Sequence, residues 1–196
     1  MRSEYELRDL LESNPIIASI KSGDDLEAVL KSQCQIVFIL YGNLCNIAGI
    51  VSTLKDAGKL VFVHADLLEG VSSKEVVVQF LSETTGADGI ISAKNNLLKA
   101  AKATGMYTVH RFFLIDSMSL ANLTKQVINS DADCVEIMPG YGPKGIRWVL
   151  RDMEDQNLDK PLIASGLVCT KEDVTNALAA GASAISTTCT SVWDDI

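Results

Sequence analysis

Short apolar strands alternate with helical stretches along this chain of 196 residues, and this repetition constrains its fold more than any other feature. Each gap between strands holds a stretch with helical periodicity, for example 24–31, 46–57, 95–104 and 171–180. The predicted strands, rich in β-branched or aliphatic residues, lie at 15–20, 36–40, 60–64, 89–92, 108–113, 134–138, 161–165 and 184–187. A strand followed by a helix, repeated in this way, requires parallel strands joined by right-handed crossovers.

Eight near-equal units without a long insertion favour a closed barrel over an open, doubly wound sheet. Signals for helix ends support this division into units, because Gly58, Gly105 and Gly181 follow helical stretches at the place where a left-handed residue ends a helix. Thr170 begins a capping box, and Pro143 suits a first helical position. The sequence therefore predicts the α/β class: one small (β/α)8 TIM barrel over residues 15–196, in a single domain spanning 1–196. Residues 1–14 are expected to form a short helix that closes the bottom of the barrel.

Composition excludes several classes of protein. Hydrophobic residues make up 47% of the chain and charged residues 21%, as in ordinary globular proteins. The N-terminal residues lack the apolar core of a signal peptide, and no run of eighteen apolar residues could span a bilayer, so we expect a cytoplasmic protein without a membrane partner. The net charge of −8 argues against nonspecific binding to nucleic acid.

The five cysteines form no C-x-x-C pair, and no histidine lies at metal-ligand spacing from them. We expect reduced, mostly buried thiols, with no metal and no cofactor. The cysteines are Cys34, Cys45, Cys134, Cys169 and Cys189.

Charged residues stand at the carboxyl ends of several predicted strands, where the functional groups of such barrels gather. Arg111 and Glu136 lie inside apolar runs, and a charge buried there must be paired or must meet a ligand. They could instead pair with each other, a lysine at a strand end could simply be solvated, and His64 could be a core histidine. His110 has the opposite parity to Arg111 and is expected to face the helices. The candidate pocket residues from these strand ends are Lys21, His64, Asp66, Lys94, Arg111 and Glu136.

Small residues follow the last two strands, at the position where barrels commonly hold a phosphate group. Ser165 and Gly166 end the seventh strand, and Ser186 and Thr187 end the eighth. Glycine lets the backbone come close to an anion, and the hydroxyls can donate hydrogen bonds without bulk. The sequence predicts a phosphate site here; the alternative is an ordinary turn of small residues.

Six segments, in this order, resemble the bacterial glycerol uptake operon antiterminator family. They are 62–70 (FVHADLLEG), 88–94 (DGIISAK), 111–117 (RFFLIDS), 136–140 (EIMPG), 161–167 (PLIASGL) and the region 181–193. The resemblance implies a barrel that binds glycerol 3-phosphate as an effector, with the phosphate near Ser165, Gly166, Ser186 and Thr187. It further implies action on the leader mRNA of glycerol-utilisation operons, and a sensor without turnover, so no residue is assigned a catalytic role.

Two positions depart from the family pattern. Ser165 stands where the family more often has glycine, and Ala93 where threonine is commoner. Neither change removes a charged group, so the ligand class implied by the resemblance is kept.

Two other functions remain open. A phosphosugar aldolase or isomerase could form a Schiff base on Lys94 or Lys21 and move protons with Asp66 or Glu136. A metabolite-binding protein without an RNA role is the third reading, because the fold alone cannot choose among these functions.

The candidate RNA-binding residues are Lys144, Arg147 and Arg151, which share one face of a predicted helix. A solvated helix face would give the same pattern. The sequence leaves a homo-oligomer open.

Overall fold

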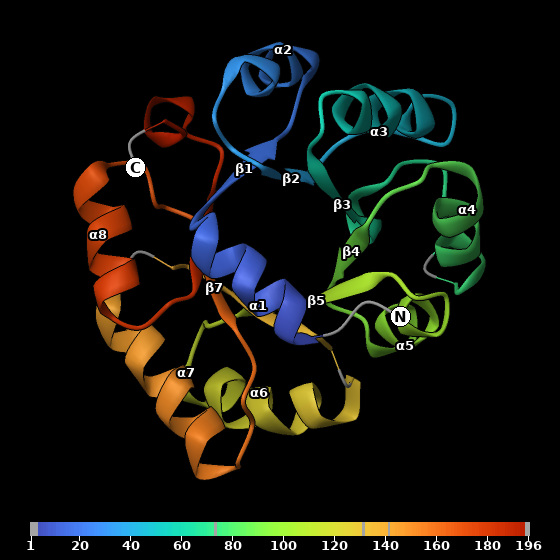
Figure 1. Ribbon diagram of the computed structural model, residues 1–196. Helices are drawn as coiled ribbons and strands as arrows, with labels where there is room; N and C mark the ends of the chain where they lie inside the picture. The colour runs from blue at the N-terminus through green and yellow to red at the C-terminus, as the bar shows by residue number, and fades with distance from the viewer. Residues whose placement is uncertain (1–3, 73, 131, 141, 195–196) are drawn as a thin grey trace.

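The computed structural model describes residues 4–72, 74–130, 132–140 and 142–194. Its strands are all parallel and close into a barrel in sequence order, which confirms the predicted (β/α)8 fold (Figure 1). The strands are β1 (Ile16–Ile20), β2 (Ile36–Ile39), β3 (Leu60–His64), β4 (Gly89–Ser92), β5 (Tyr107–Phe113), β6 (Cys134–Met138), β7 (Leu162–Ser165) and β8 (Ala184–Thr187).

Helices surround the barrel and follow each of the first seven strands. Within the described residues, β8 is followed by the short 3-10 helix η2 (Thr190–Val192) instead of a full helix. A second 3-10 helix, η1 (Ala65–Leu67), follows β3 directly. The surrounding helices are α2 (Gly23–Lys31), α3 (Ile47–Asp56), α4 (Val76–Thr84), α5 (Asn95–Ala103), α6 (Ser117–Ser130), α7 (Pro143–Asp155) and α8 (Lys171–Ala179). None of the described helices is long and apolar enough to cross a membrane.

The predicted helix before the first strand is present as α1 (Glu4–Ser13), which lies across the centre of the ring in Figure 1. Leu7 and Leu11 are fully buried against inward-facing strand residues such as Ile17 and Ile36. Burying two leucines covers apolar barrel residues at this end that would otherwise meet water. Because α1 closes the N-terminal mouth, only the opposite, C-terminal mouth remains for a ligand.

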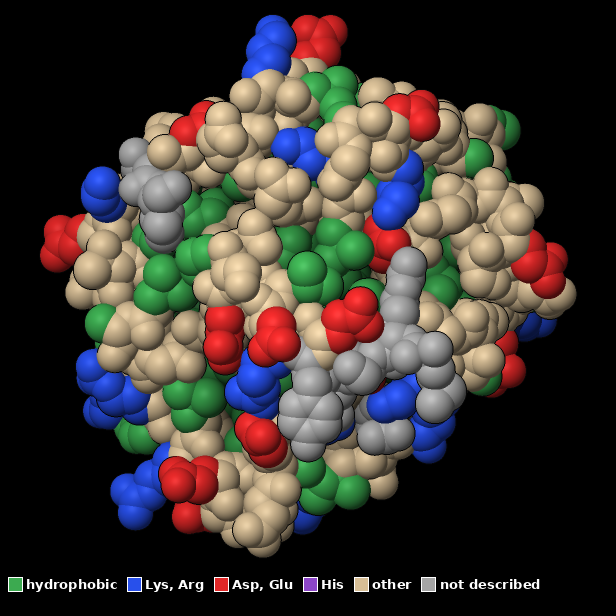
Figure 2. All heavy atoms as spheres, viewed as in Figure 1, with side chains coloured by type: hydrophobic (Ala, Val, Ile, Leu, Met, Phe, Trp, Pro, Cys, Tyr) green, Lys and Arg blue, Asp and Glu red, His purple; other side chains and the backbone are tan. Residues whose placement is uncertain are grey.

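The face seen in Figure 2 is the one that α1 covers, and acidic side chains gather in the middle of it. On α1, Arg8 forms an ion pair with Asp159 at 2.5 Å. Excess negative charge repels an anion. An anionic ligand is therefore disfavoured on this face.

The inside of the barrel is packed with aromatic rings in its lower half. Phe38 and Phe62 meet edge to face, with their ring centroids 5.4 Å apart, and Tyr107 stacks on Phe62 at 6.2 Å. Gly89 makes room for them, since a Cβ there would lie 2.5 Å from the Phe62 ring. These packed rings confine any cavity inside the barrel to the C-terminal ends of the strands.

The helix signals in the sequence are confirmed. Gly58, Gly105 and Gly181 all have positive φ after a helix. Thr170 forms a capping box with Asp173 at the start of α8, and Pro143 stands in the first turn of α7. His110 faces outward as expected, its Nδ1 lying 2.9 Å from the hydroxyl of Ser130 on α6.

Candidate functional site

A buried ion pair stands inside the barrel where β5 and β6 lie side by side. Arg111 and Glu136 are register partners on these strands. Arg111 donates from Nε to Glu136 Oε2 at 2.6 Å and from Nη2 to Oε1 at 3.1 Å. The Ser165 hydroxyl on β7 also donates to Glu136 Oε1. The internal pair that the sequence left open is therefore present, and three donors satisfy a carboxylate that has no solvent exposure.

His64, at the end of β3, lies in the field of this pair. The pKa of His64 is lowered to about 4, mainly by burial and then by the charge of Arg111, against the raising effects of Glu136 and Asp66. The imidazole is therefore neutral at neutral pH. Among the described residues, Nδ1 of His64 has no hydrogen-bond partner, although its surroundings are buried. A buried polar atom without a partner is costly unless a ligand or water meets it.

A cavity of about 130 Å³ opens beside the ion pair at the ends of β7 and β8. Arg111 reaches it from one side, and Gly166 lies in the loop that forms its rim. The residues around it are Ser19, Leu40, Arg111, Met138, Ser165, Gly166, Leu167, Val168, Cys169, Ser186, Thr187 and Thr188. All four residues that the sequence nominated for phosphate are thus brought together around one cavity with Arg111.

The backbone of Gly166 has a φ of +77°, which side chains rarely tolerate, and a Cβ there would lie 2.9 Å from Cε of Met138. Glycine is therefore required both for the turn and for the space next to the cavity. The hydroxyls nearby are already engaged. Ser19 and Ser186 share a hydrogen bond of 2.7 Å, and Thr187 donates to the carbonyl of Val168 at 2.5 Å. These bonds use the Thr187 hydroxyl proton and one of the two serine protons, so phosphate contacts would fall mainly to Arg111, backbone N–H groups and the remaining serine hydroxyl.

The other nominated residues lie away from this cavity. Lys21 is exposed after β1, and its backbone N–H donates to Asp25 at 2.8 Å. Asp66 lies in η1 and accepts from the Ser92 hydroxyl at 2.9 Å, while the Lys94 ammonium is 3.3 Å from the Asp66 carboxylate. Asp66 and Lys94 thus form a polar group of their own at the rim between β3 and β4. Lys21 and Lys94 do not line the cavity, and neither do His64 and Glu136, although Glu136 bonds to the lining residues Arg111 and Ser165.

Several residues around the cavity were not among the candidates from the sequence, and Ser19 and Met138 are two of them. Ser19 is a polar residue in the apolar strand β1, with the inward parity of Ile17, and this signal could have identified it. Met138 is apolar, and no chemical feature marked it. Met138 borders the cavity because it lies at the end of β6, next to Gly166 in the loop after β7.

The three basic residues nominated for RNA are exposed on α7, as expected for a surface helix. The Lys144 ammonium lies 4.6 Å from the centre of the Trp148 ring. Trp148 and Arg151 border a groove of about 630 Å³ between α6 and α7, together with Asp116, Asp152 and Asp155. Acidic groups therefore alternate with the basic ones here, and RNA binding stays a prediction.

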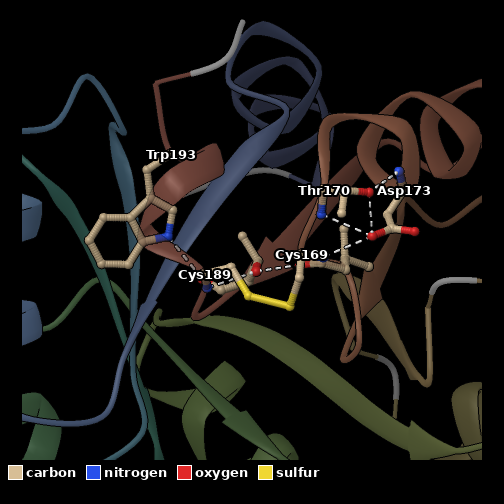
Figure 3. Close-up of a disulfide and its surroundings, with 7 residues drawn as sticks. Cys169, Thr170, Asp173, Cys189 and Trp193 are labelled. Carbon is tan, nitrogen blue, oxygen red and sulfur yellow. Dashed lines mark hydrogen bonds between the residues drawn. A yellow bond between two sulfur atoms is a disulfide. The ribbon is translucent and has the colours of Figure 1, made fainter.

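The expectation that all cysteines are reduced is wrong for one pair. Cys169, after β7, and Cys189, after β8, form a disulfide (Figure 3). They are 20 residues apart and meet only because neighbouring parallel strands end at the same level. Cysteine spacing along the chain could not show this. Cys34 and Cys134 are buried and free, and Cys45 is exposed and free.

Comparison with known proteins places this geometry in a family. A protein family described as glycerol-3-phosphate responsive antiterminator matches residues 16–193. The chain is 51% identical over 187 residues to YgcP of Escherichia coli K12, described as uncharacterised, covering 95% of both chains.

Solved structures agree with the family match. A glycerol uptake operon antiterminator regulatory protein from Listeria monocytogenes has a TM-score of 0.82 at 30% identity, covering 88% of this chain and 91% of that one. A related antiterminator-type protein from Thermotoga maritima has a TM-score of 0.79 at 32% identity, covering 92% and 98%. A deoxyribose phosphate aldolase from Aeropyrum pernix shares the fold alone, with a TM-score of 0.71 at 16% identity over 95% and 89%. The chain belongs to the glycerol-3-phosphate responsive antiterminator family.

Proposed function

We propose that this protein binds glycerol 3-phosphate at the C-terminal mouth of its barrel and regulates transcription past a terminator in the leader mRNA of glycerol-utilisation genes, without catalytic turnover. The observation that carries the proposal is the cavity at the ends of β7 and β8, where the Gly166 loop meets the guanidinium of Arg111. A flexible glycine backbone beside a buried cation suits a small phosphate ester.

The phosphate is assigned to the side of the cavity formed by Gly166 and Arg111. Arg111 uses Nε and Nη2 to hold Glu136, and the guanidinium carries further N–H groups that can face an anion. Ser165, Ser186 and Thr187 shape the wall. A bound phosphate would therefore meet positive charge in a place that is largely shielded from water, where such a contact is strong.

The glycerol hydroxyls are assigned to the groups around Glu136 and His64. Glu136 accepts from Ser165 and Arg111, and Nδ1 of His64 is buried without a partner in the described structure. A ligand hydroxyl could supply that partner and remove its cost. Glycerol and phosphate each satisfy only half of such a site, so the intact ester should bind best.

The positions of the lysines support the proposed absence of turnover. A Schiff-base enzyme needs a lysine within reach of the bound carbonyl. Lys21 and Lys94, the candidates for that role, do not line the cavity, and Lys94 lies beside the Asp66 carboxylate. These positions disfavour an aldolase that would form a Schiff base on a lysine in this cavity.

The test is a melting series with glycerol 3-phosphate, glycerol and inorganic phosphate. A ligand that binds only the folded chain stabilises it by about 2.7 kcal/mol at a hundredfold excess over Kd, which raises the Tm of a chain of this size by roughly 5–10 °C. We expect this shift with the ester and little with glycerol. An equal shift with free phosphate, or none with the ester, would remove the proposed ligand. Trapping of a lysine adduct by borohydride with small phosphosugars would instead support the enzyme.

Regulation itself is tested by transcription of a template that carries a glycerol-gene leader and its terminator. We expect readthrough to rise when the protein and glycerol 3-phosphate are both added, because the ligand selects the active form. Protein that binds the ester but leaves readthrough unchanged would be a metabolite-binding protein with another partner.

A further inference from the structure

The disulfide joins the two loops that frame the proposed ligand cavity. Cys169 lies in the loop between β7 and α8, three residues after Gly166, and itself borders the cavity. Cys189 follows Thr187 and Thr188, which border it from β8. The Cα atoms of the two cysteines are 5.3 Å apart, within the normal range for a disulfide. The bond therefore sets the distance between the two sides of the mouth.

Hydrogen bonds tie the backbone of Cys189 to the cavity wall and the backbone of Cys169 to the start of α8 (Figure 3). The N–H of Cys189 donates to the hydroxyl of Thr187 at 3.0 Å, and that hydroxyl donates to the carbonyl of Val168 at 2.5 Å. The indole N–H of Trp193 donates to the carbonyl of Thr187 at 3.0 Å. On the other side, the N–H of Cys169 donates to Asp173 at 3.1 Å. Movement of either cysteine would thus move backbone at the mouth of the cavity.

Reagents can reach this pair but not the buried thiols. Cys169 is exposed and Cys189 is partly exposed. Burial raises the pKa of Cys34 to about 11 and raises that of Cys134 well above its usual value, so neither forms the reactive thiolate readily. Cys45 is exposed, but it is free in this structure and lies outside the set of residues that border the cavity.

We propose that Cys169 and Cys189 form a reversible redox site that controls how tightly the neighbouring cavity binds its ligand. The inference rests on the proposed function, because it takes the cavity to be the glycerol 3-phosphate site. The oxidised form holds the two loops in the arrangement that the ligand requires. In the reduced form the loops lose this restraint, so binding must also order them, which weakens it.

The oxidant required is a peroxide. One cysteine thiolate attacks a peroxide oxygen, which gives a sulfenic acid and, after protonation, one water. The second thiol then attacks the sulfenic sulfur, forms the disulfide and releases a second water. Two thiols have lost two electrons and two protons in total, and the peroxide has accepted them. A thiol reductant reverses the change by thiol–disulfide exchange.

The experiment measures the Kd for glycerol 3-phosphate by calorimetry on wild-type protein treated with hydrogen peroxide or with a thiol reductant. Mass spectrometry after alkylation reports the state of the pair in each sample. We expect the oxidised protein to bind about tenfold more tightly, a change of about 1.4 kcal/mol. Cys189→Ser should bind like the reduced wild type under both treatments. The matched control Cys45→Ser, which removes an exposed cysteine elsewhere, should keep the full response.

Two outcomes overturn the proposal: no disulfide between Cys169 and Cys189 after oxidation, or equal Kd values in the two states. If neither state binds glycerol 3-phosphate, the proposed function fails, and the redox site is then judged by hydrogen exchange. The backbone amides of 166–168 should exchange more slowly in the oxidised wild type than in Cys189→Ser. Equal rates there would show that the bond does not restrain the loop.

Discussion

At the scale of single residues, the most costly feature of the molecule is the pair of opposite charges inside the barrel. Moving Arg111 and Glu136 out of water is unfavourable, and attraction between them offsets that cost only when the remaining polar atoms are satisfied. The Ser165 hydroxyl completes the set on Glu136. Ser165 therefore gives the buried carboxylate a donor besides the guanidinium of Arg111.

Arg111→Met separates the two roles of the arginine. The variant leaves Glu136 buried and unpaired, so the free energy of unfolding should fall by about 3–5 kcal/mol. The shift of Tm with glycerol 3-phosphate should also disappear, because the cavity loses its cation. The matched variant Arg111→Met/Glu136→Gln removes the unpaired charge and should recover much of the stability but none of the binding. Normal binding by either variant would mean that Arg111 does not contact the ligand.

The two histidines predict a loss of stability in mild acid. Burial lowers the pKa of both His64 and His110 to about 4, from 6.5 in the unfolded chain. Above pH 6.5 both groups are neutral in either state. As the pH falls from 6.5 towards 4, the unfolded chain binds protons that the folded protein does not, so stability decreases. Between pH 6.5 and 5.5 each histidine should lower the free energy of unfolding by about 1 kcal/mol.

Urea unfolding of His110→Gln at both pH values checks this. The variant should lose about half of the histidine contribution, since only His64 still titrates. His64→Gln/His110→Gln gives the baseline that the carboxylates alone produce. A wild-type pH dependence in His110→Gln would show that His110 is protonated equally in both states.

At the scale of elements, the loops after β7 and β8 decide what the barrel can bind. Thr187 connects them, because its hydroxyl donates to Val168 while its carbonyl accepts from Trp193. The Trp193 indole lies in the segment that follows η2, where the other strands are followed by a full helix. The last element thus contributes a hydrogen bond to the end of β8, while the Trp193 carbonyl accepts from the Cys34 thiol.

Gly166→Ala tests the contribution of the β7 loop to the site. Its φ of +77° should cost about 1–2 kcal/mol of stability once a Cβ is present. The new methyl group would also push Met138, whose Cε is 2.9 Å away, and so crowd the cavity. We expect the melting shift with glycerol 3-phosphate to be lost.

Gly58→Ala is a close control for backbone strain. Gly58 has a φ of +76°, and a Cβ there meets nothing within 4 Å. Both variants should lose stability from backbone strain, as measured by denaturant unfolding, with a further loss in Gly166→Ala from the contact with Met138, while only Gly166→Ala loses ligand binding. Loss of binding in both, or in neither, would contradict the assignment of the phosphate to the Gly166 loop.

The elements were predictable from the sequence because their signals are local. Every strand was predicted to within one residue at each end, since buried parallel strands read as continuous apolar runs between polar helix starts. Contacts between strand ends were less accessible. Asp66 lies in η1, so the alternation of side chains along a strand does not apply to it. Ile91 points into the barrel, so Ser92, the next residue of β4, points the other way. Parity alone therefore could not show that Asp66 and Lys94 form a separate group, nor that Cys169 meets Cys189.

At the scale of the whole molecule, the net charge of −8 is the main obstacle to RNA binding. Acidic side chains gather in the middle of the face covered by α1 (Figure 2), which disfavours a phosphate backbone there. Lys144, Arg147 and Arg151 offer a local exception on α7, although Asp152 and Asp155 follow on the same helix. Any RNA contact must therefore depend on where basic residues lie on the surface more than on the net charge of the chain.

Reversal of the three basic residues of α7 to Glu tests this dependence on position. Each phosphate contact that is lost should make the slope of log K against log salt shallower by about one, because fewer counterions are released on binding. The control is reversal of Lys31, Lys74 and Lys171, which are exposed on other parts of the surface. Both triple variants change the net charge by the same amount, so a general electrostatic effect would weaken leader-RNA binding equally in both. We expect a shallower slope only in the α7 variant, with the glycerol 3-phosphate melting shift intact in both. Equal slopes in the two variants would place the RNA surface elsewhere.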